Sequence, residues 1–299
     1  MSSINAISAE KLARLVGTPK CPTLVDVRTD EDFASEPRLV PGSVRRPADD
    51  PSGWATEFAG RTFTAPRARC RLMAEAILRH VDPGRALRVL DLGCGTGEQI
   101  FELARALPAA DLTGIDISRE SIRVAQDAQR TLAGRARLSF LAADYMDFRA
   151  APFDVILSDG VLHTIAVPSP QLFAKIAGDL TSGGILVYTM PYPCLYNRAL
   201  TSVRRVFRSA QSPLTDSLIL AVARGIHGRR YDLALLRERV PYMYLLPERD
   251  HGPALREILD ASCGLELVGE YPFPHASIAQ LKHRMAVFRK REPGADGAA

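Results

Sequence analysis

The sequence predicts an α/β protein whose mostly parallel sheet carries helices on both faces. From about residue 66 onward, helical and strand patterns alternate, which is typical of parallel sheets with helical crossovers. A buried strand pattern runs directly into the glycine-rich stretch "RVLDLGCGTGEQ" at 88–99. The 299 residues are 46% hydrophobic and 24% charged, the ordinary composition of a globular protein. Together these observations indicate a Rossmann-like sheet with a ligand at the glycine turn.

Composition and charge exclude several classes of protein. The formal net charge is only +4, which favours a partner other than nucleic acid. The five cysteines form no CxxC pair and are odd in number, so we expect no disulfide framework and no metal site. The first residues lack a basic stretch followed by an apolar run, and no uncharged stretch reaches about 18 residues. We therefore expect a cytoplasmic protein with no membrane partner.

The chain divides at a polar stretch rich in Pro and Gly that begins "DDPSGW". We expect residues 1–52 to form a small N-terminal segment, residues 53–65 a linker and residues 66–290 the α/β domain. Within that domain, residues 191–251 form an insertion between the fifth strand and the last helix. Residues 291–299 have the composition of a disordered tail.

The N-terminal segment contains a helical pattern at 8–17, a short apolar strand at 22–28 and a second extended piece at 38–47. This order resembles the first half of a rhodanese-like domain. Asp26 and Arg28 match the DxR motif of that family, and we assign them a structural ion pair. The strand that ends in the nucleophilic cysteine of a rhodanese is missing, so we expect no sulfurtransferase activity.

The α/β domain begins with a helical pattern at 66–81. The further helices are expected at 97–107, 118–133, 169–180 and 252–264. The strands are expected at 87–93, 111–117, 136–144, 153–160, 183–193, 265–273 and 282–290.

The glycine turn departs from the pattern that binds dinucleotides. Gly93, Gly95 and Gly97 replace the G-x-G-x-x-G spacing that lets a pyrophosphate rest on a helix N-terminus. Asp91 lies just before them, and a carboxylate there repels a pyrophosphate but attracts an ammonium or sulfonium group. S-adenosylmethionine carries both cations and no phosphate. The sequence therefore favours S-adenosylmethionine as the ligand.

Acidic residues also end the next two strands. Asp116 comes about nineteen residues after the glycine turn, where an acid can accept hydrogen bonds from both ribose hydroxyls. Ile117 beside it is expected to lie against the adenine. After the third strand, Ala143 and Tyr145 are expected to border the ring, and Asp144 to accept from its amino group. Helix capping or turn formation is the alternative role for each acid.

These residues resemble the class I S-adenosylmethionine-dependent methyltransferases over roughly residues 66–190 and 252–290. The "VLDLGCGTG" turn, the two later acids, "FDVILSDGVLHT" and "LTSGGILVYT" carry the resemblance. It implies seven strands, with the last one antiparallel. Arg67 and Arg69 are candidates to pair with the ligand's carboxylate. The residues expected to contact the cofactor lie at the ends of four strands: Asp91, Gly93, Cys94, Gly95, Thr96, Gly97, Asp116, Ile117, Ala143, Asp144, Tyr145, Ser158, Asp159 and Gly160.

The acceptor side is less defined by sequence. His163 follows the fourth strand, and two roles stay open for it: a general base for an attacking hydroxyl, or a packed residue near the pocket. In the insertion, Tyr192, Tyr196, Arg198 and Tyr242 are candidates to bind substrate. The many arginines of the insertion either clamp an anionic substrate or form a solvated helix face.

The leading interpretation is a methyltransferase that acts on the O, N or S atom of a small molecule, in bacterial specialised or accessory metabolism. The first alternative is a methyltransferase of nucleic acid or protein, although the fourth strand ends in "LSDG" and lacks the Asn-Pro-Pro-Tyr type of motif. The second alternative is a non-catalytic scaffold that binds S-adenosylmethionine and recruits a partner through a degenerate rhodanese-like segment. Homodimer formation is left open.

Overall fold

The computed structural model divides into two compact units, Met1–Thr56 and Glu57–Ala299. It describes residues 64–130, 137–227, 240–274 and 280–292 continuously. In addition, it describes the isolated positions 13–16, 18, 25–26, 38, 44–45, 233 and 236–237.

The described part of the first unit contains a helical turn at 13–15 and two short strands. Strand β1 (Val25–Asp26) pairs in parallel with β2 (Val44–Arg45). Both strands fall within the extended stretches expected from the sequence. The expected ion pair of the DxR motif lies outside the described residues, and the likeness to a rhodanese stays a prediction.

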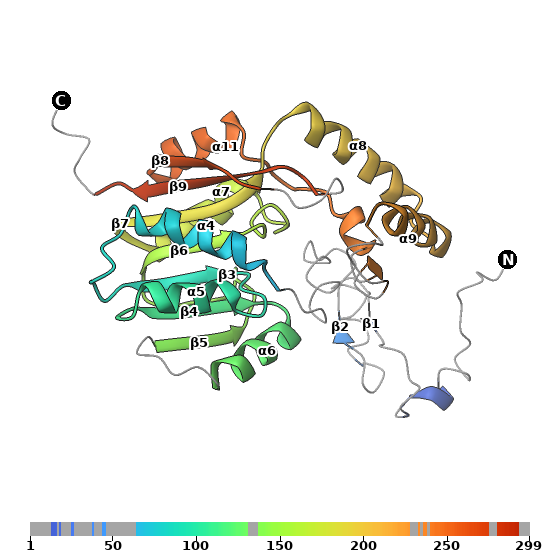
Figure 1. Ribbon diagram of the computed structural model, residues 1–299, viewed down its shortest axis with the longest axis horizontal. Coiled ribbons are helices and arrows are strands. Elements are labelled where there is room, and N and C mark those ends of the chain that lie inside the picture. The colour runs from blue at the N-terminus through green and yellow to red at the C-terminus, as the bar shows by residue number, and fades with distance from the viewer. Residues whose placement is uncertain are drawn as a thin grey trace. The chain divides into compact units, whose positions relative to one another are not determined.

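The second unit is built on one seven-stranded sheet in the order β5-β4-β3-β6-β7-β9-β8, from bottom to top in Figure 1. β9 runs antiparallel to both of its neighbours, and the other adjacent pairs are parallel. The seven-stranded sheet with one antiparallel strand is therefore confirmed. The strands are β3 (Arg88–Leu92), β4 (Asp111–Asp116), β5 (Arg137–Ala142), β6 (Phe153–Asp159), β7 (Leu180–Pro191), β8 (Leu265–Pro272) and β9 (His283–Lys290).

Helices cover both faces of this sheet because successive strand residues point to opposite sides. In β3, Val89 joins a core cluster with apolar residues of α4, α5 and α6, whereas Leu90 joins a second cluster with α7, α11 and η2. Val155 and Ile156 of β6 divide between the clusters in the same way. The helices are α4 (Arg67–Leu78), α5 (Glu98–Ala106), α6 (Arg119–Arg130), α7 (Ser169–Asp179), α11 (Pro253–Glu257) and the π-helix η2 (Ile258–Ser262).

One edge of the sheet brings together the ends that matter for the site. The five strands β3 to β7 are parallel, so their carboxyl ends meet at this edge, on the right in Figure 1. β9 runs the opposite way, and its first residue, His283, pairs with Pro191 at the end of β7. The residue that starts β9 therefore lies at the same edge as the residues that end β6 and β7.

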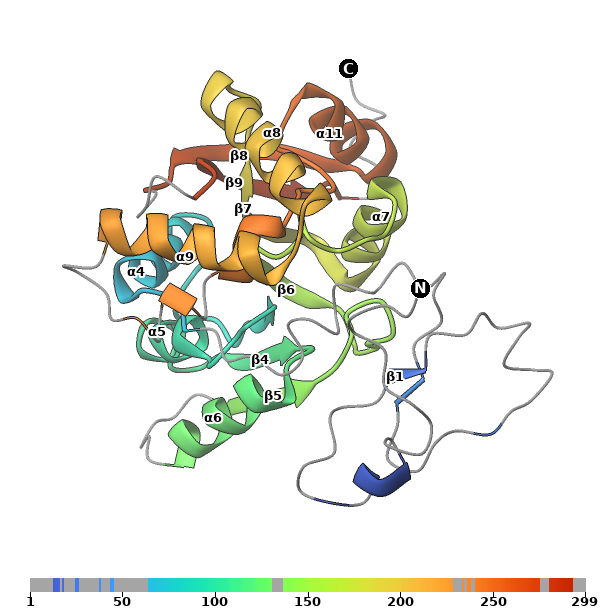
Figure 2. The same cartoon turned by 90° about the vertical axis from the view of Figure 1, so that its right-hand side faces the viewer.

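The insertion after β7 folds into α8 (Leu195–Ser209), α9 (Pro213–His227) and the 3₁₀-helix η1 (Val240–Tyr244). Figure 2 looks toward the carboxyl edge and shows α8 and α9 across its upper part. Asn197 anchors α8, because its side-chain amide donates to the carbonyls of Tyr192 and Lys282 and its oxygen accepts from the Lys282 N–H. The expected helical insertion is present.

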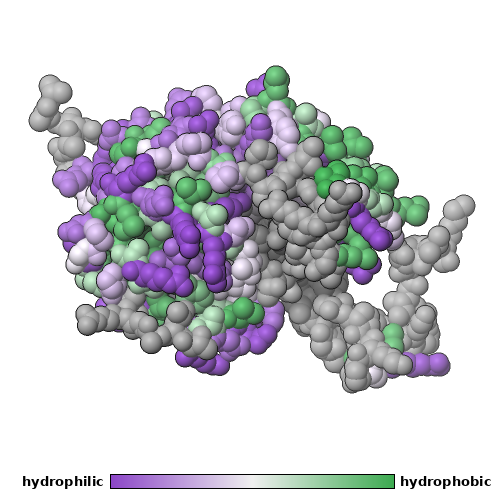
Figure 3. All heavy atoms as spheres, in the orientation of Figure 1, coloured by the Kyte–Doolittle hydropathy of each residue, from purple (hydrophilic) through white to green (hydrophobic). Residues whose placement is uncertain are grey.

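Apolar side chains gather on the outer surface of the two insertion helices (Figure 3). The exposed members repeat at helical spacing: Val203, Val206, Leu214, Leu218, Val222 and Ile226. A homodimer stays open, as it was from the sequence.

Candidate functional site

The glycine turn between β3 and α5 has a backbone shape that only glycines tolerate. Gly93 and Gly97 have φ of +79° and +86°, in the left-handed region that side chains disfavour. A Cβ atom on Gly93 would also lie 2.4 Å from Val161, and one on Gly97 would lie 2.8 Å from the Phe140 ring. The turn is tied to β4, because the N–H groups of Gly93 and Cys94 both donate to the carbonyl of Ile115.

Asp91 is the buried acid of the site. Asp91 is the second-to-last residue of β3 and is only 2% exposed. Its Oδ2 has no hydrogen-bond partner among the described residues. Burial raises the pKa of Asp91 well above its usual value, and the nearby carboxylates of Asp159 and Asp116 raise it further. A buried, unpaired carboxylate among other acids is stabilised by a cationic partner.

Asp116 binds the turn. At the end of β4, Asp116 Oδ2 accepts from the Gly95 N–H at 2.9 Å, and its Oδ1 accepts from the Ser118 N–H at 2.8 Å. These two bonds partly offset the effect of burial, which raises the pKa of Asp116. Each carboxylate oxygen keeps a second lone pair, so the group is able to accept further bonds from a ligand.

Cys94 and Thr96, two other residues of the glycine turn, have buried side chains. Cys94 is buried beneath the turn, where its sulfur packs so tightly on Gly114 that a Cβ there would lie 2.8 Å away. Burial raises the pKa of the Cys94 thiol well above its usual value. Thr96 is also buried and donates its hydroxyl to Thr64 at 3.0 Å. The side chains of Cys94 and Thr96 therefore both make contacts within the protein.

The structure places Tyr145 in the core instead of beside a ring-binding site. Its side chain is 3% exposed, and its hydroxyl donates to Asp179 of α7 at 2.9 Å. The Lys175 ammonium lies 4.6 Å from the ring centroid. Tyr145 follows an exposed Asp144, whose Oδ1 accepts from the Met146 N–H and so forms a turn that directs the next side chain inward. The sequence expectation that Tyr145 walls the adenine differs from this placement.

Ile117 and Ala143 lie where the sequence places them, at the ends of β4 and β5. Both residues are half-buried, and the Ala143 N–H donates to the Asp116 carbonyl at 3.0 Å. They therefore border the same edge as Asp116.

An ion pair occupies the end of β6. Arg69 of α4 donates its Nε and Nη2 to the two carboxylate oxygens of Asp159 at 3.1 and 2.5 Å. The Thr189 hydroxyl of β7 donates to the same carboxylate. Ser158 is fully buried and donates to the Leu92 carbonyl, so its side chain joins two strands. Gly160 has φ of +72°, and a Cβ there would meet nothing closer than 4.0 Å.

One arginine, Arg249, fixes the loop after β6, which carries His163. Arg249, 8% exposed, donates to the carbonyls of Leu162, Ile165 and Val167 and to the Ser169 hydroxyl. The adjoining Glu248 N–H donates to the His163 carbonyl at 2.8 Å. Arg249 is thus a positioning residue, and nothing in its local sequence signalled this role.

The His163 ring lies against His283 of β9, with ring centroids 5.3 Å apart. His163 Nδ1 and His283 Nε2 are buried and have no hydrogen-bond partner among the described residues. The sequence indicated His163 but missed His283, because the two lie 120 positions apart and meet only through the antiparallel last strand.

The comparisons with known proteins agree with this geometry. Residues 83–215 match the family model for a methyltransferase domain. Trans-aconitate 2-methyltransferase from Streptomyces avermitilis is 34% identical over 125 residues, which cover 41% of this chain and 46% of that protein. Release factor glutamine methyltransferase from Moorella thermoacetica is 31% identical over 105 residues, covering 34% and 37%. The chain thus spans less than half the length of both relatives.

A solved structure shares the fold. Magnesium protoporphyrin IX methyltransferase from Synechocystis PCC 6803, with bound S-adenosylhomocysteine, aligns with a TM-score of 0.50 and 16% identity over 82% of this chain and 95% of that one. The class I fold expected from the sequence is therefore confirmed.

Two tyrosines of the insertion contact charged residues at the start of β9. The Arg284 guanidinium lies 4.9 Å from the centroid of the Tyr192 ring, and the Lys282 ammonium lies 4.9 Å from that of Tyr196. Arg198 is exposed on α8, and Tyr242 is half-buried in η1. Their expected contact with substrate stays a prediction.

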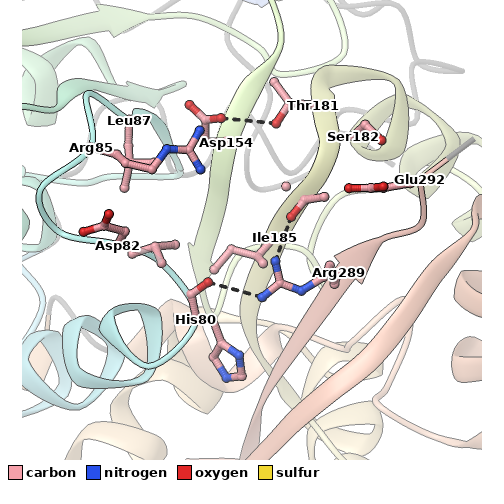
Figure 4. Close-up of a pocket in the computed structure, with 13 residues that line it drawn as sticks. His80, Asp82, Arg85, Leu87, Asp154, Thr181, Ser182, Ile185, Arg289 and Glu292 are labelled. Carbon is pink, nitrogen blue, oxygen red and sulfur yellow. Dashed lines mark hydrogen bonds between the residues drawn. The ribbon is translucent and has the colours of Figure 1, made fainter.

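A polar pocket of about 270 Å³ lies at the opposite edge of the sheet (Figure 4). Arg289 donates to the carbonyls of Gly183 and His80, and the Thr181 hydroxyl donates to Asp154. None of the predicted site residues lines this pocket. The residues expected to contact the cofactor therefore lie away from this pocket.

Within the described ranges, no group of three His, Cys, Asp or Glu side chains has the arrangement of a metal site. None of the helices described is long and apolar enough to cross a bilayer.

Proposed function

We propose that this chain transfers the methyl group of S-adenosylmethionine to a small-molecule acceptor. The observation that carries the proposal is the buried Asp91 carboxylate near the end of β3, which lies beside the glycine turn and whose Oδ2 has no hydrogen-bond partner among the described residues. A cationic ligand stabilises such a buried carboxylate. S-adenosylmethionine is cationic, and its sulfonium carries an activated methyl group.

The residues at the carboxyl edge fit this ligand. Asp91 would attract its cationic end, directly or through water, and Asp116 has lone pairs for the ribose hydroxyls. Ile117 and Ala143 would border the adenine, and the exposed Asp144 would accept from its amino group. At Gly93 and Gly97 a side chain would collide with Val161 or Phe140, so the turn keeps its shape only with glycine at these two positions.

The protein's remaining task is to bring the acceptor into line with the methyl group. Much of the acceleration of such a displacement comes from orientation, which a rigid loop supplies better than a mobile one. Arg249 holds the His163 loop through four hydrogen bonds to neutral oxygens. A small acceptor is favoured by the match to trans-aconitate 2-methyltransferase and by the insertion that lies across the edge.

Ligand-induced stabilisation tests the choice of cofactor. S-adenosylmethionine at a hundred times its Kd should stabilise the folded protein by about 2.7 kcal/mol through mass action, and NADH should not. Thermal unfolding with each ligand measures this difference. Stabilisation by NADH alone would refute the assignment of Asp91.

Product formation tests the reaction. Incubation with S-adenosylmethionine and pooled small-molecule acceptors should yield S-adenosylhomocysteine, measured by mass spectrometry. Turnover only with a protein or nucleic-acid acceptor would select the first alternative. Binding without turnover on any of these would select the scaffold.

A further inference from the structure

Three polar side chains from distant parts of the chain meet beside the end of β6. His163 comes from the loop after β6, His283 from the start of β9 and Arg204 from α8. The imidazole centroids lie 5.3 Å apart and the rings are inclined at 49°. Arg204 is 7% exposed and donates Nη1 to the Leu245 carbonyl at 3.1 Å.

The two histidines present an unmet demand for hydrogen bonds. His163 Nδ1 and His283 Nε2 are both buried, and neither has a partner among the described residues. Buried polar atoms in folded proteins nearly always have partners, so two unsatisfied nitrogens on adjacent rings indicate a group supplied from outside the described chain. Three separate elements, the loop after β6, the start of β9 and α8, must converge to form this cluster. This convergence argues against a chance arrangement of the three side chains.

The same place lies next to the proposed methyl donor. β6 ends at Asp159, which faces Thr189 of β7 in the sheet register, and Pro191 two residues later faces His283. Asp159 in turn is close enough to raise the pKa of Asp91. The histidine pair is therefore the next group along the sheet edge from the acids that we assign to S-adenosylmethionine.

The charges around the rings are mainly positive. Arg204, Arg249 and the neighbouring imidazole of His283 lower the pKa of His163 after burial itself, and only Asp159 opposes them. Burial, Arg69 and Arg204 lower the pKa of His283 to about 3. Both shifts favour the neutral imidazole, which keeps one N–H to donate. Asp159 is already paired with Arg69.

We propose that His163, His283 and Arg204 bind an anionic oxygen group of the acceptor. The inference rests on the proposed methyl transfer and specifies its acceptor as a carboxylate or an ionised hydroxyl. Neutral N–H donors and a buried guanidinium suit an anionic oxygen, whereas a protonated amine would be repelled by the arginines.

An ionised acceptor also removes the need for a base. A lone pair of the oxygen forms the O–CH₃ bond while the S–CH₃ bond breaks, and sulfur keeps that electron pair as a neutral thioether. No proton leaves the acceptor. Under this proposal His163 binds and orients the acceptor, and it does not accept a proton.

Titration of ¹⁵N-histidine-labelled protein, followed by NMR, tests the proposal without turnover. We expect sodium acetate or 4-nitrophenolate to shift the ring nitrogens of His163 and His283 saturably, and methylammonium at equal ionic strength not to. The response to acetate or to nitrophenolate distinguishes a carboxylate from an ionised hydroxyl. His251 is an internal control, because its ring already bonds to Tyr188 and Glu270.

Substitutions sharpen the test. His283→Phe keeps a ring but removes both nitrogens, and we expect it to weaken binding of the responding anion about tenfold or more. Arg204→Gln should do the same, whereas Arg205→Gln, at the exposed neighbouring position on α8, should not. Equal shifts with methylammonium, or no anion response in the parent protein, would overturn the proposal.

A separate measurement distinguishes failure of the proposed function from failure of this inference. Calorimetry with S-adenosylmethionine on the same samples reports the cofactor site alone. Cofactor binding without an anion response removes only the acceptor assignment, whereas no cofactor binding removes the proposed function.

Discussion

The two halves of the carboxyl edge are built in different ways. On the β3–β5 side, the groups that we assign to the cofactor are backbone atoms of a glycine turn and the acids at the ends of successive strands. On the β6–β9 side, the groups are side chains of His163, His283 and Arg204, which converge from a loop, a strand and an inserted helix. The first half is a local feature of the sheet, whereas the second exists only after the whole domain has folded.

This difference predicts how each half responds to substitution. The glycine turn is fixed by φ angles and by contacts with Val161 and Phe140, so almost any side chain there disrupts it. The acceptor half is fixed by hydrogen bonds between side chains and backbone groups that are distant in the sequence. We therefore expect substitutions in the first half to weaken cofactor binding and those in the second to alter acceptor use.

The largest expected effect is that of Asp116→Ala on cofactor affinity. The change would remove the two ribose contacts that we propose, and it frees the Gly95 and Ser118 N–H groups that now donate to Asp116. Bonds to a charged acceptor are worth about 1.5–3 kcal/mol each, so calorimetry should show affinity for S-adenosylmethionine weakened about 100-fold or more.

Asp127→Ala is the matched control, since Asp127 is an exposed acid of α6 that pairs only with surface arginines among the described residues. It should bind the cofactor like the parent. A folded Asp116→Ala protein with unchanged affinity would disprove the ribose assignment.

The same division marks what the sequence revealed. The positions of the strands along the chain, the glycine turn and the acids at 91, 116 and 144 follow from local patterns, because strand ends and turns are encoded within a few residues. The placement of Tyr145 did not follow, since its direction depends on the turn at Asp144 and on Asp179 of a later helix. Arg249 and His283 gave no local signal, because their partners lie up to 120 positions away.

The next largest effect is expected on turnover. Arg249→Met fills similar volume but releases the carbonyls of the loop at 162–167. A misplaced acceptor costs about 10²-fold in rate, so we expect a fall of that order in kcat with cofactor affinity preserved. Steady-state kinetics and calorimetry measure the two halves separately. A parallel loss of cofactor affinity would show that the halves are not independent.

Asp91→Asn should separate cofactor binding from stability. Because the pKa of Asp91 is raised in the folded protein, its ionisation costs stability as pH rises through that raised value. The neutral Asn removes this cost, so the ligand-free variant should melt at a higher temperature at neutral pH and lose part of the pH dependence of melting.

The same substitution should weaken the binding of S-adenosylmethionine about tenfold at neutral pH, because a charged hydrogen bond or ion pair is lost. In the parent protein, affinity should fall as pH is lowered and Asp91 takes up a proton. Affinity in Asp91→Asn should change less over that range. An equal pH dependence in both proteins would assign the effect to another group.

The smallest expected effect on the site is that of Tyr145→Phe. If Tyr145 formed the adenine wall expected from the sequence, loss of its hydroxyl would still leave the ring in place, so the informative readout is stability. The hydroxyl donates to Asp179, and its removal should cost about 1 kcal/mol of unfolding free energy, while Lys175 continues to pair with Asp179. Affinity for S-adenosylmethionine should stay at the parent value, because the ring lies in the core cluster with α7.

Tyr145→Ala extends the comparison: it should destabilise the fold strongly through the cavity it leaves, and the folded fraction should still bind the cofactor. Loss of binding in a folded Tyr145→Ala protein would return this side chain to the cofactor half of the edge.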